Sequence, residues 1–293
     1  MYNLLMFIKA NAKVNFYLKV YPKTGEKHPL ESIFFPLYDL YDEIEISKAD
    51  TLSCQTIGAD IPEEDNLCYR IARDFGKYKI VIKKNIPLGA GLGGGSSDAA
   101  AVLLAINELE ELNFPKGGLA RIASKYGADI PFFIYNEPSL VTGFGEKIQP
   151  IEYMPFGKKL TLYTNKYHSS TKDVYAEFDR QLLKRKKATN QSAPSLLCLL
   201  LIDCLRRDIR VNPKIMSQDI LDYDKRFGEL CHSLHNDLQE PCFALNSQIK
   251  KLYDAIPTPY KLLSGSGSSF FTLTENEFQP FKHEELVAYE FSI

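Results

Sequence analysis

The segment 87–100 combines closely spaced glycines with two serines and an aspartate, residue types suited to holding phosphate. It reads PLGAGLGGGSSDAA and places five glycines in the seven positions from 89 to 95. Glycine permits positive φ and leaves no side chain between backbone N–H groups and a ligand. A helix starting at Ser96 or Ser97 would add unpaired amides and the positive end of its dipole. We therefore predict a phosphate-binding loop between a strand and this helix.

The same loop admits two other interpretations. Gly89, Gly91 and Gly94 satisfy the GxGxxG pattern of dinucleotide-binding folds, and Glu108 and Glu110 follow about twenty residues later. These acids fall within or at the end of the expected helix, whereas a dinucleotide fold needs an acid after a second parallel strand. The loop lacks a Walker GK[ST], and the sequence contains no HRD motif. The remaining alternative is a structural connection capped by serine, which the conformational cost of so many glycines disfavours.

Hydrophobic periodicity predicts the elements around the loop. Alternation over 14–20 indicates a half-buried strand with Lys13 and Asn15 on its polar face. The turn 264–269 is expected to join a hairpin. Further strands are expected at 32–35, 43–46, 79–83 and 159–163, and helices at 97–112 and 119–126, the second closed by Gly127.

Length and composition bound the class of protein. A chain of 293 residues is longer than one hydrophobic core usually organises, which allows one large domain or two moderate ones. We predict two, with a boundary near 150–157, where two prolines and a glycine interrupt the pattern. The net charge of -2 predicts no broad positive surface that would attract nucleic acid or an anionic membrane. Six cysteines without a CxxC pair indicate neither a zinc site nor a disulfide framework.

The first residues of the chain and the length of its apolar run predict a cytoplasmic protein. The first eight residues lack a basic region and a cleavage site, and the apolar run 196–202 is too short to span a membrane. The basic run 184–187 is expected to be a solvated loop.

Five segments in a consistent order together resemble the GHMP kinases, the family of galactokinase, homoserine kinase and mevalonate kinase. They are AKVN at 12–15, the loop at 87–100, GADIPFF at 127–133, NDL at 236–238 and LSGSGSS at 263–269. The resemblance covers Lys13 to Phe271, nearly the whole chain. It implies an α+β fold of two domains, an N-terminal domain like ribosomal protein S5 domain 2 over 1–153 and a ferredoxin-like C-terminal domain over 154–293.

The family resemblance implies ATP-dependent phosphorylation of an alcohol, with ATP and Mg²⁺ as cofactors. Asp129 matches the aspartate that acts on the acceptor hydroxyl, and Lys13 matches the lysine beside it. A cation there would keep the carboxylate charged and compensate transition-state charge. From the residues alone, Asp129 is equally a helix N-cap ahead of Pro131, and Lys13 a solvated strand lysine.

The resemblance also assigns residues to the nucleotide. Asn66 and Lys84 match positions around the adenine, and Ser97 is the protein oxygen expected at Mg²⁺. The expected contacts of the loop with ATP are Pro87, Gly89, Gly91, Leu92, Gly93, Gly94, Gly95, Ser96 and Ser97.

Within the family, the form GLGGGSS is most similar to members that phosphorylate a cytidine diphosphate-linked polyol. His28 matches the residue that reads the cytosine, although Lys27 stands where those members have a stacking tyrosine. Tyr175 matches the aromatic residue on the opposite face of the base. The other expected contacts with the acceptor are Asn15, Thr171, Gly265 and Ser266.

Two classes of function remain open at the level of sequence. An active kinase would act on this polyol or on a related alcohol such as homoserine or a mevalonate derivative. A binding module or sensor would keep the nucleotide fold without the chemistry, which the retention of Lys13 and Asp129 argues against. For either class we expect a small-molecule ligand, no nucleic-acid or membrane partner, and a monomer or homodimer.

Overall fold

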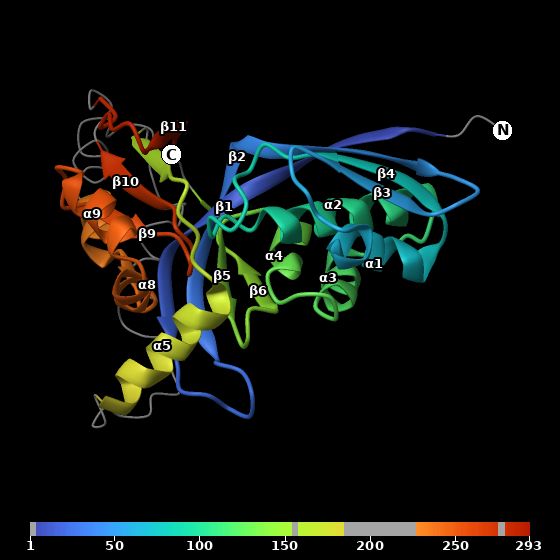
Figure 1. The fold of residues 1–293 in the computed structure, drawn as a ribbon. Coiled ribbons are helices and arrows are strands. Elements are labelled where there is room, and N and C mark those ends of the chain that lie inside the picture. The colour runs from blue at the N-terminus through green and yellow to red at the C-terminus, as the bar shows by residue number, and fades with distance from the viewer. Residues whose placement is uncertain (1–3, 154–157, 185–226, 275–278) are drawn as a thin grey trace, which may run out of the picture.

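The computed structural model describes residues 4–153, 158–184, 227–274 and 279–293, which form two β-sheets flanked by helices (Figure 1). The predictions for the basic run after Lys184, for the apolar run 196–202, and for Cys198 and Cys204 lie outside these residues. The other four cysteines are buried free thiols.

The first sheet contains seven strands and carries its helices on one face (Figure 1). Its main path runs β3-β4-β2-β1-β8, with β5 paired to β2 and β6 paired to β5. The strands are β1 (Met6–Val20), β2 (Leu30–Lys48), β3 (Ser53–Ile57), β4 (Tyr78–Lys83), β5 (Ser139–Thr142), β6 (Lys147–Pro150) and β8 (His235–Asn236). The helices are α1 (Leu67–Phe75), α2 (Gly94–Leu109), α3 (Lys116–Ala123) and α4 (Ile130–Tyr135), with a 3₁₀ turn at Glu63–Asp65.

The second sheet is antiparallel and has the order β11-β7-β10-β9. Its strands are β7 (Lys159–Thr164), β9 (Lys261–Leu263), β10 (Phe270–Thr274) and β11 (Val287–Ser292). Helices α5 (Thr171–Lys184), α8 (Gln239–Leu245) and α9 (Ser247–Ala255) belong to this half of the chain. Phe270 pairs with Leu263, so the turn 264–269 joins a hairpin as predicted.

The change from one sheet to the other falls where the sequence predicts a boundary, between β6 and β7. The separation is incomplete, because β8 returns from the C-terminal half and pairs in parallel with β1 at Tyr17 and Leu18. The domain limits 1–153 and 154–293 therefore stay a prediction. None of the helices that the structure describes is long and apolar enough to cross a membrane.

Several predicted elements differ in extent from the observed ones. The strands expected at 32–35 and 43–46 are one strand, β2, whose pairing with β1 shifts register between Asn11 and Ala12. Helix α3 ends at Ala123 with Ser124 at its C-cap, so Gly127 does not close it. Helix α2 begins at Gly94, which is earlier than predicted, and it is followed by α3 rather than by a parallel strand. The dinucleotide-fold interpretation is thus excluded.

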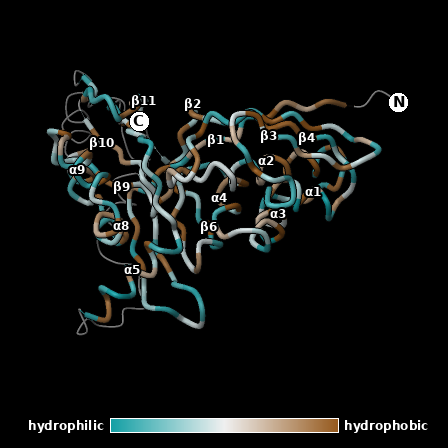
Figure 2. The backbone as a smooth tube through the Cα atoms, viewed as in Figure 1, coloured by the Kyte–Doolittle hydropathy of each residue, from teal (hydrophilic) through white to brown (hydrophobic). Residues whose placement is uncertain are grey.

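The core that positions the loop lies between the two sheets. Phe16 of β1 stacks on Phe35 of β2 with ring centroids 4.8 Å apart, and it lies 5.5 Å from Phe271 of β10. All three side chains are buried in one cluster. In Figure 2 the hydrophobic colour recurs along the strands of the first sheet and along α2. The two sheets thus share one hydrophobic core through β1.

We expect Phe16→Ala to lower the free energy of unfolding by about 3–5 kcal/mol, because it leaves a cavity where both sheets meet. Urea denaturation followed by circular dichroism would measure this. Phe7→Ala is the matched control, since Phe7 lies on the same strand and is 69% exposed. Equal effects of the two substitutions would contradict the shared core.

Candidate active site

Two glycine-containing turns, 87–93 and 264–269, pack backbone against backbone. Gly91 has φ +77°, and a Cβ added there would lie under 3.0 Å from the carbonyl oxygen of Ser264. A Cβ on Gly267 would overlap the backbone of Gly91 in the same way. Ser269 N–H donates to the carbonyl of Ala90 at 3.3 Å. The glycines at these two positions are therefore required by contact between the turns.

Asn236 and Asp237, which the sequence offered only as part of a motif, connect the second turn and β1. The Asn236 amide nitrogen donates to the carbonyls of Leu263 (2.8 Å) and Gly265 (2.7 Å). The Asp237 carboxylate accepts the Val20 N–H at 2.8 Å. The segment around β8 thus links β1 to the turn 264–269.

Lys13 lies between the two turns. Its backbone N–H donates to the carbonyl of Leu92 at 3.0 Å, and its ammonium donates to Asn15 Oδ1 at 2.7 Å. The ammonium lies 4.6 Å from the centroid of the Phe34 ring. Burial lowers the pKa of Lys13, and the charge of Asp129 opposes this shift.

The predicted half-buried strand is wrong at this point, because both faces of β1 are covered. Lys13 is 3% exposed and Asn15 is 1% exposed, so the polar face points into the protein rather than into water. The solvated-lysine alternative for Lys13 is therefore excluded.

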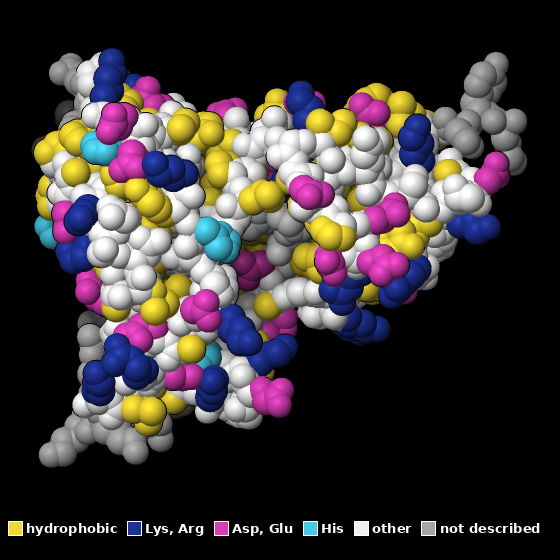
Figure 3. Space-filling view, in the orientation of Figure 1, with side chains coloured by type: hydrophobic (Ala, Val, Ile, Leu, Met, Phe, Trp, Pro, Cys, Tyr) yellow, Lys and Arg dark blue, Asp and Glu magenta, His cyan; other side chains and the backbone are white. Residues whose placement is uncertain are grey.

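Asp129 occupies the N-cap position of α4, as the sequence allows, but its side chain makes no capping hydrogen bond. It is half-buried and lines a cavity of about 250 Å³ together with Lys13. The space-filling view is hollowed where the two halves of the molecule meet (Figure 3). The other residues lining this cavity are Asn15, Leu18, Leu30, Phe34, Gly91, Gly93, Thr171, Tyr175, Leu238, Gly265 and Ser266.

Most of the predicted acceptor residues meet at this cavity. Thr171 Oγ1 lies 2.8 Å from Ser266 Oγ, which joins the start of α5 to the second turn. Burial, followed by the charge of Asp129, raises the pKa of Tyr175. Asn15, Gly265, Thr171, Tyr175 and Ser266 all line the cavity, and their contact with the acceptor stays a prediction.

His28 does not line the cavity, although it lies close by. Its ring centroid is 5.3 Å from that of Tyr175, so the two rings are in contact. The Nδ1 of His28 lies 2.9 Å from the carbonyl of Tyr21, and Nε2 lies 3.3 Å from Asp179 Oδ1. Lys27 is exposed. The base-reading role of His28 stays a prediction.

A second cavity of about 250 Å³ follows the glycine loop and shares Gly91 and Gly93 with the first. Eight of the nine loop residues predicted to contact the nucleotide line it: Pro87, Gly89, Gly91, Leu92, Gly93, Gly94, Gly95 and Ser96. Ser97 does not, and it is buried because α2 already begins at Gly94. Lys84 lines the cavity, whereas Asn66 caps α1 by accepting the Cys68 N–H at 2.9 Å.

The amide of Asn66 also donates to Thr56 Oγ1 at 3.2 Å, so both ends of the side chain have protein partners. Its contact with adenine stays a prediction. Within the described ranges, no group of three or more His, Cys, Asp or Glu side chains is arranged to hold a metal ion.

Sequence reasoning missed the roles of five residues that shape the site. Asn236, Asp237 and Asp98 stand inside the family motifs, so their positions were visible but their roles were not. Phe34 and Asp42 lie in β2 without any motif, and only their approach to Lys13 and Lys84 in space identifies them.

Comparison with known proteins matches the chain to the GHMP kinases N terminal domain over residues 66–137. The chain is 35% identical over 284 residues to the 4-diphosphocytidyl-2-C-methyl-D-erythritol kinase of Chlorobium phaeobacteroides (strain BS1), covering 92% of this chain and 88% of that protein.

Solved structures agree with this match. A crystal structure of 4-(cytidine 5'-diphospho)-2C-methyl-D-erythritol kinase superimposes with a TM-score of 0.64 at 28% identity, covering 92% of this chain and 90% of the other. Homoserine kinase from Cytophaga hutchinsonii gives a TM-score of 0.59 at 16% identity, covering 99% and 94%, which shows a shared fold alone.

We expect Gly267→Ala to separate the two turns, because its Cβ would overlap the backbone of Gly91 rather than a flexible side chain. Such overpacking should lower the free energy of unfolding by about 1–3 kcal/mol and weaken nucleotide binding. Gly228→Ala is the control, since a Cβ there meets no atom within 4 Å. Unchanged stability in Gly267→Ala, measured by urea denaturation, would show that the turns do not need this contact.

Proposed function

The chain belongs to the GHMP kinase family, and we propose that it transfers the terminal phosphoryl group of ATP to the 2-hydroxyl of 4-diphosphocytidyl-2-C-methyl-D-erythritol. It is a small-molecule kinase with an alcohol as acceptor. We place the reaction in non-mevalonate isoprenoid precursor synthesis and the enzyme in the cytoplasm.

The proposal is carried by the junction of the two cavities at Gly91 and Gly93, with Lys13 and Asp129 lining the acceptor side. Phosphoryl transfer requires that nucleotide and acceptor meet in line, with little covalent chemistry left for the protein. A nucleotide along the glycine loop would direct its terminal phosphate to this junction. The acceptor cavity extends from there toward Thr171 and Tyr175.

The two reacting side chains have complementary roles in this scheme. Asp129 orients the acceptor hydroxyl and accepts its proton, because its carboxylate makes no capping bond that would compete. Lys13 stabilises the developing alkoxide and the transferred phosphoryl oxygens by its positive charge in a buried setting. Asn15 Oδ1 accepts a hydrogen bond from the Lys13 ammonium at 2.7 Å and so orients it.

We include Mg²⁺ as a cofactor, whose charge would neutralise the phosphate oxygens during transfer. Ser97 is buried and does not line the nucleotide cavity, which supports a metal held mainly by ATP and water. Ser96 is the hydroxyl-bearing residue of the loop that lines the nucleotide cavity.

The acceptor is tested by measuring ADP release with 4-diphosphocytidyl-2-C-methyl-D-erythritol, homoserine and mevalonate in turn. We expect turnover with the cytidine-linked polyol alone, and phosphorus NMR of the product should locate the new phosphate on the 2-hydroxyl. Turnover with homoserine or mevalonate only would refute the assignment of the cytidine-linked polyol as the acceptor. ATP binding without turnover on any of the three would favour a sensor.

The roles of the reacting groups are tested by Asp129→Asn and Lys13→Met. Each should reduce kcat by about 10²–10⁴-fold, because general-base or charge-stabilising catalysis is lost, while ATP affinity changes little. Lys9→Met is the matched control, since Lys9 is exposed on the same strand. Steady-state kinetics together with calorimetric ATP binding distinguish the outcomes. Full activity in Asp129→Asn would remove this residue from the mechanism.

A further inference from the structure

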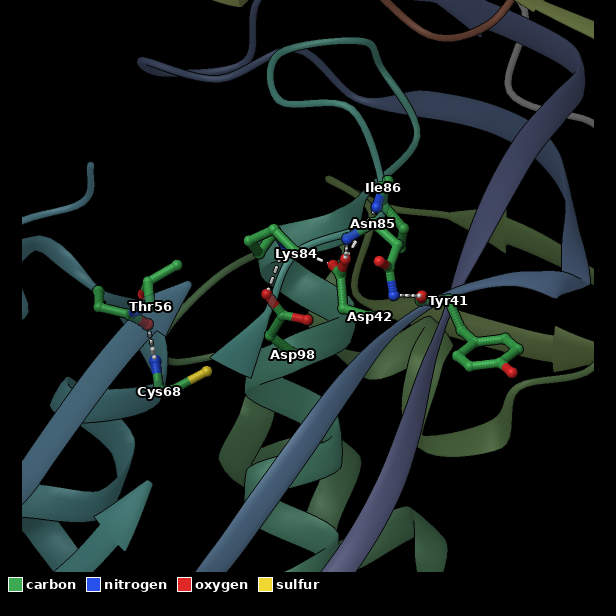
Figure 4. A network of polar contacts seen from close by, with 9 residues as sticks. Tyr41, Asp42, Thr56, Cys68, Lys84, Asn85, Ile86 and Asp98 are labelled. Atoms are coloured by element: carbon green, nitrogen blue, oxygen red, sulfur yellow. Dashed lines mark hydrogen bonds and ion pairs between the residues drawn. The ribbon is translucent and has the colours of Figure 1, made fainter. Parts of the chain in front are cut away.

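A buried ion triad lies beneath the glycine loop, where the chain leaves β4 and enters α2 (Figure 4). The ammonium of Lys84 forms ion pairs with Asp42 of β2 and with Asp98 of α2, the latter at 2.6 Å. The three side chains are 4%, 0% and 6% exposed, respectively. One cation therefore joins three separate elements of the first sheet and its helix layer.

Asp42 holds the entry of the loop through its second oxygen. Asp42 Oδ1 accepts the backbone N–H of Asn85 at 2.6 Å and that of Ile86 at 2.8 Å. These are the two residues directly before Pro87, where the loop begins. A carboxylate that accepts two backbone N–H groups fixes the direction of the chain at this point.

Asp98 holds the exit of the loop, because it lies in the first turns of α2, four residues after Gly94. The Lys84 ammonium would lie 3.2 Å from a Cβ on Gly94, so it also sits against the start of the helix. Through this one ammonium, the entry and the exit of the loop are tied to each other and to β2.

The charges of the triad do not cancel, since two carboxylates face one ammonium. Burial alone would lower the pKa of Lys84, but attraction to Asp98 and Asp42 outweighs it and the pKa is raised. Burial raises the pKa of Asp98 to about 7, which Lys84 opposes. Asp98 Oδ1 is buried without a hydrogen-bond partner among the described residues. Asp98 is thus the less well satisfied of the two carboxylates.

This arrangement changes the role that we assign to Lys84. The family resemblance predicts a contact with adenine, yet its ammonium is engaged by two carboxylates while the residue lines the nucleotide cavity. We propose that Lys84, Asp42 and Asp98 form a loop clamp, a set of positioning residues that holds both ends of the glycine loop in the conformation that binds ATP. The inference rests on the proposed function only in requiring that this loop binds ATP.

The loop clamp predicts unequal roles for its two carboxylates. Asp42→Asn places an amide next to the Lys84 ammonium and leaves that cation short of its partner, so the entry of the loop loosens. Asp98→Asn removes the surplus charge and leaves Lys84 paired one-to-one with Asp42. We expect the dissociation constant for the nucleotide to rise about tenfold or more in Asp42→Asn and to rise less in Asp98→Asn, because an amide oxygen at position 98 can still accept from the Lys84 ammonium.

The neighbouring pair Lys83–Glu43 is a matched control. Lys83 Nζ lies 3.3 Å from Glu43 Oε2, so this pair joins β4 to β2 one residue away from Lys84 and Asp42. Both side chains are half exposed and do not reach the loop. Because exposed ion pairs contribute little, Glu43→Gln should leave nucleotide affinity unchanged.

The experiment is calorimetric titration of each variant with a non-hydrolysable ATP analogue and Mg²⁺, in the absence of any acceptor. Its outcome is independent of the acceptor assignment, so failure of the loop clamp and failure of the proposed reaction are distinguishable. In the kinase assay, Asp42→Asn should raise the KM for ATP while retaining most of kcat at saturating ATP. If Asp42 had only a general structural role, Asp42→Asn would instead lower the free energy of unfolding without raising KM for ATP selectively over its effect on kcat.

Nucleotide affinity within twofold of the parent protein in folded Asp42→Asn would overturn the proposal, as would an equal loss in Glu43→Gln. If Asp42→Asn does not fold, the double variant Lys84→Gln with Asp98→Asn replaces it. This variant keeps the total charge of the triad and the Asp42 bonds to Asn85 and Ile86, but it cuts the tie to α2. Weakening by about tenfold supports the loop clamp, and affinity within twofold of the parent protein refutes it.

Discussion

The close packing of two backbone turns, 87–93 and 264–269, is the contact on which the rest of the site depends. Side chains at Gly91 or Gly267 would occupy the space that the other turn fills. Because the turns come from different sheets, their contact joins the two halves of the chain at the point where the two cavities meet. The shared core around Phe16 supports this contact from below, and Asn236 holds the second turn.

The site contains two buried lysines whose surroundings direct them to different tasks. Lys84 faces two carboxylates, which raise its pKa, and the ion pairs between them hold the chain in position. Lys13 has an amide oxygen as its hydrogen-bond partner and interacts with Asp129 through charge, so burial prevails and its pKa is lowered. A lysine with incompletely compensated charge can act on a reacting group, whereas a fully paired one can only position its neighbours.

The polyphosphate of the nucleotide would meet a surface made largely of backbone. The loop itself carries no basic side chain, and the positive end of α2 points toward the cavity that follows it. Such a site requires the direction of each N–H group to be correct, since no long flexible side chain can compensate for a displaced loop. Anchoring at both ends of the loop meets this requirement.

The sequence by itself determined the chemistry that depends on local pattern: the glycine spacing, the strand-loop-helix order, the hairpin at 264–269 and the family segments that single out Lys13 and Asp129. Only the tertiary structure decided which face each residue presents. It buried Ser97 by starting α2 at Gly94, packed His28 against Tyr175 and brought Asp42 to Lys84. The physical reason is that hydrogen bonds and burial between β2, β4 and α2 join residues far apart in the chain, and periodicity reports only neighbours.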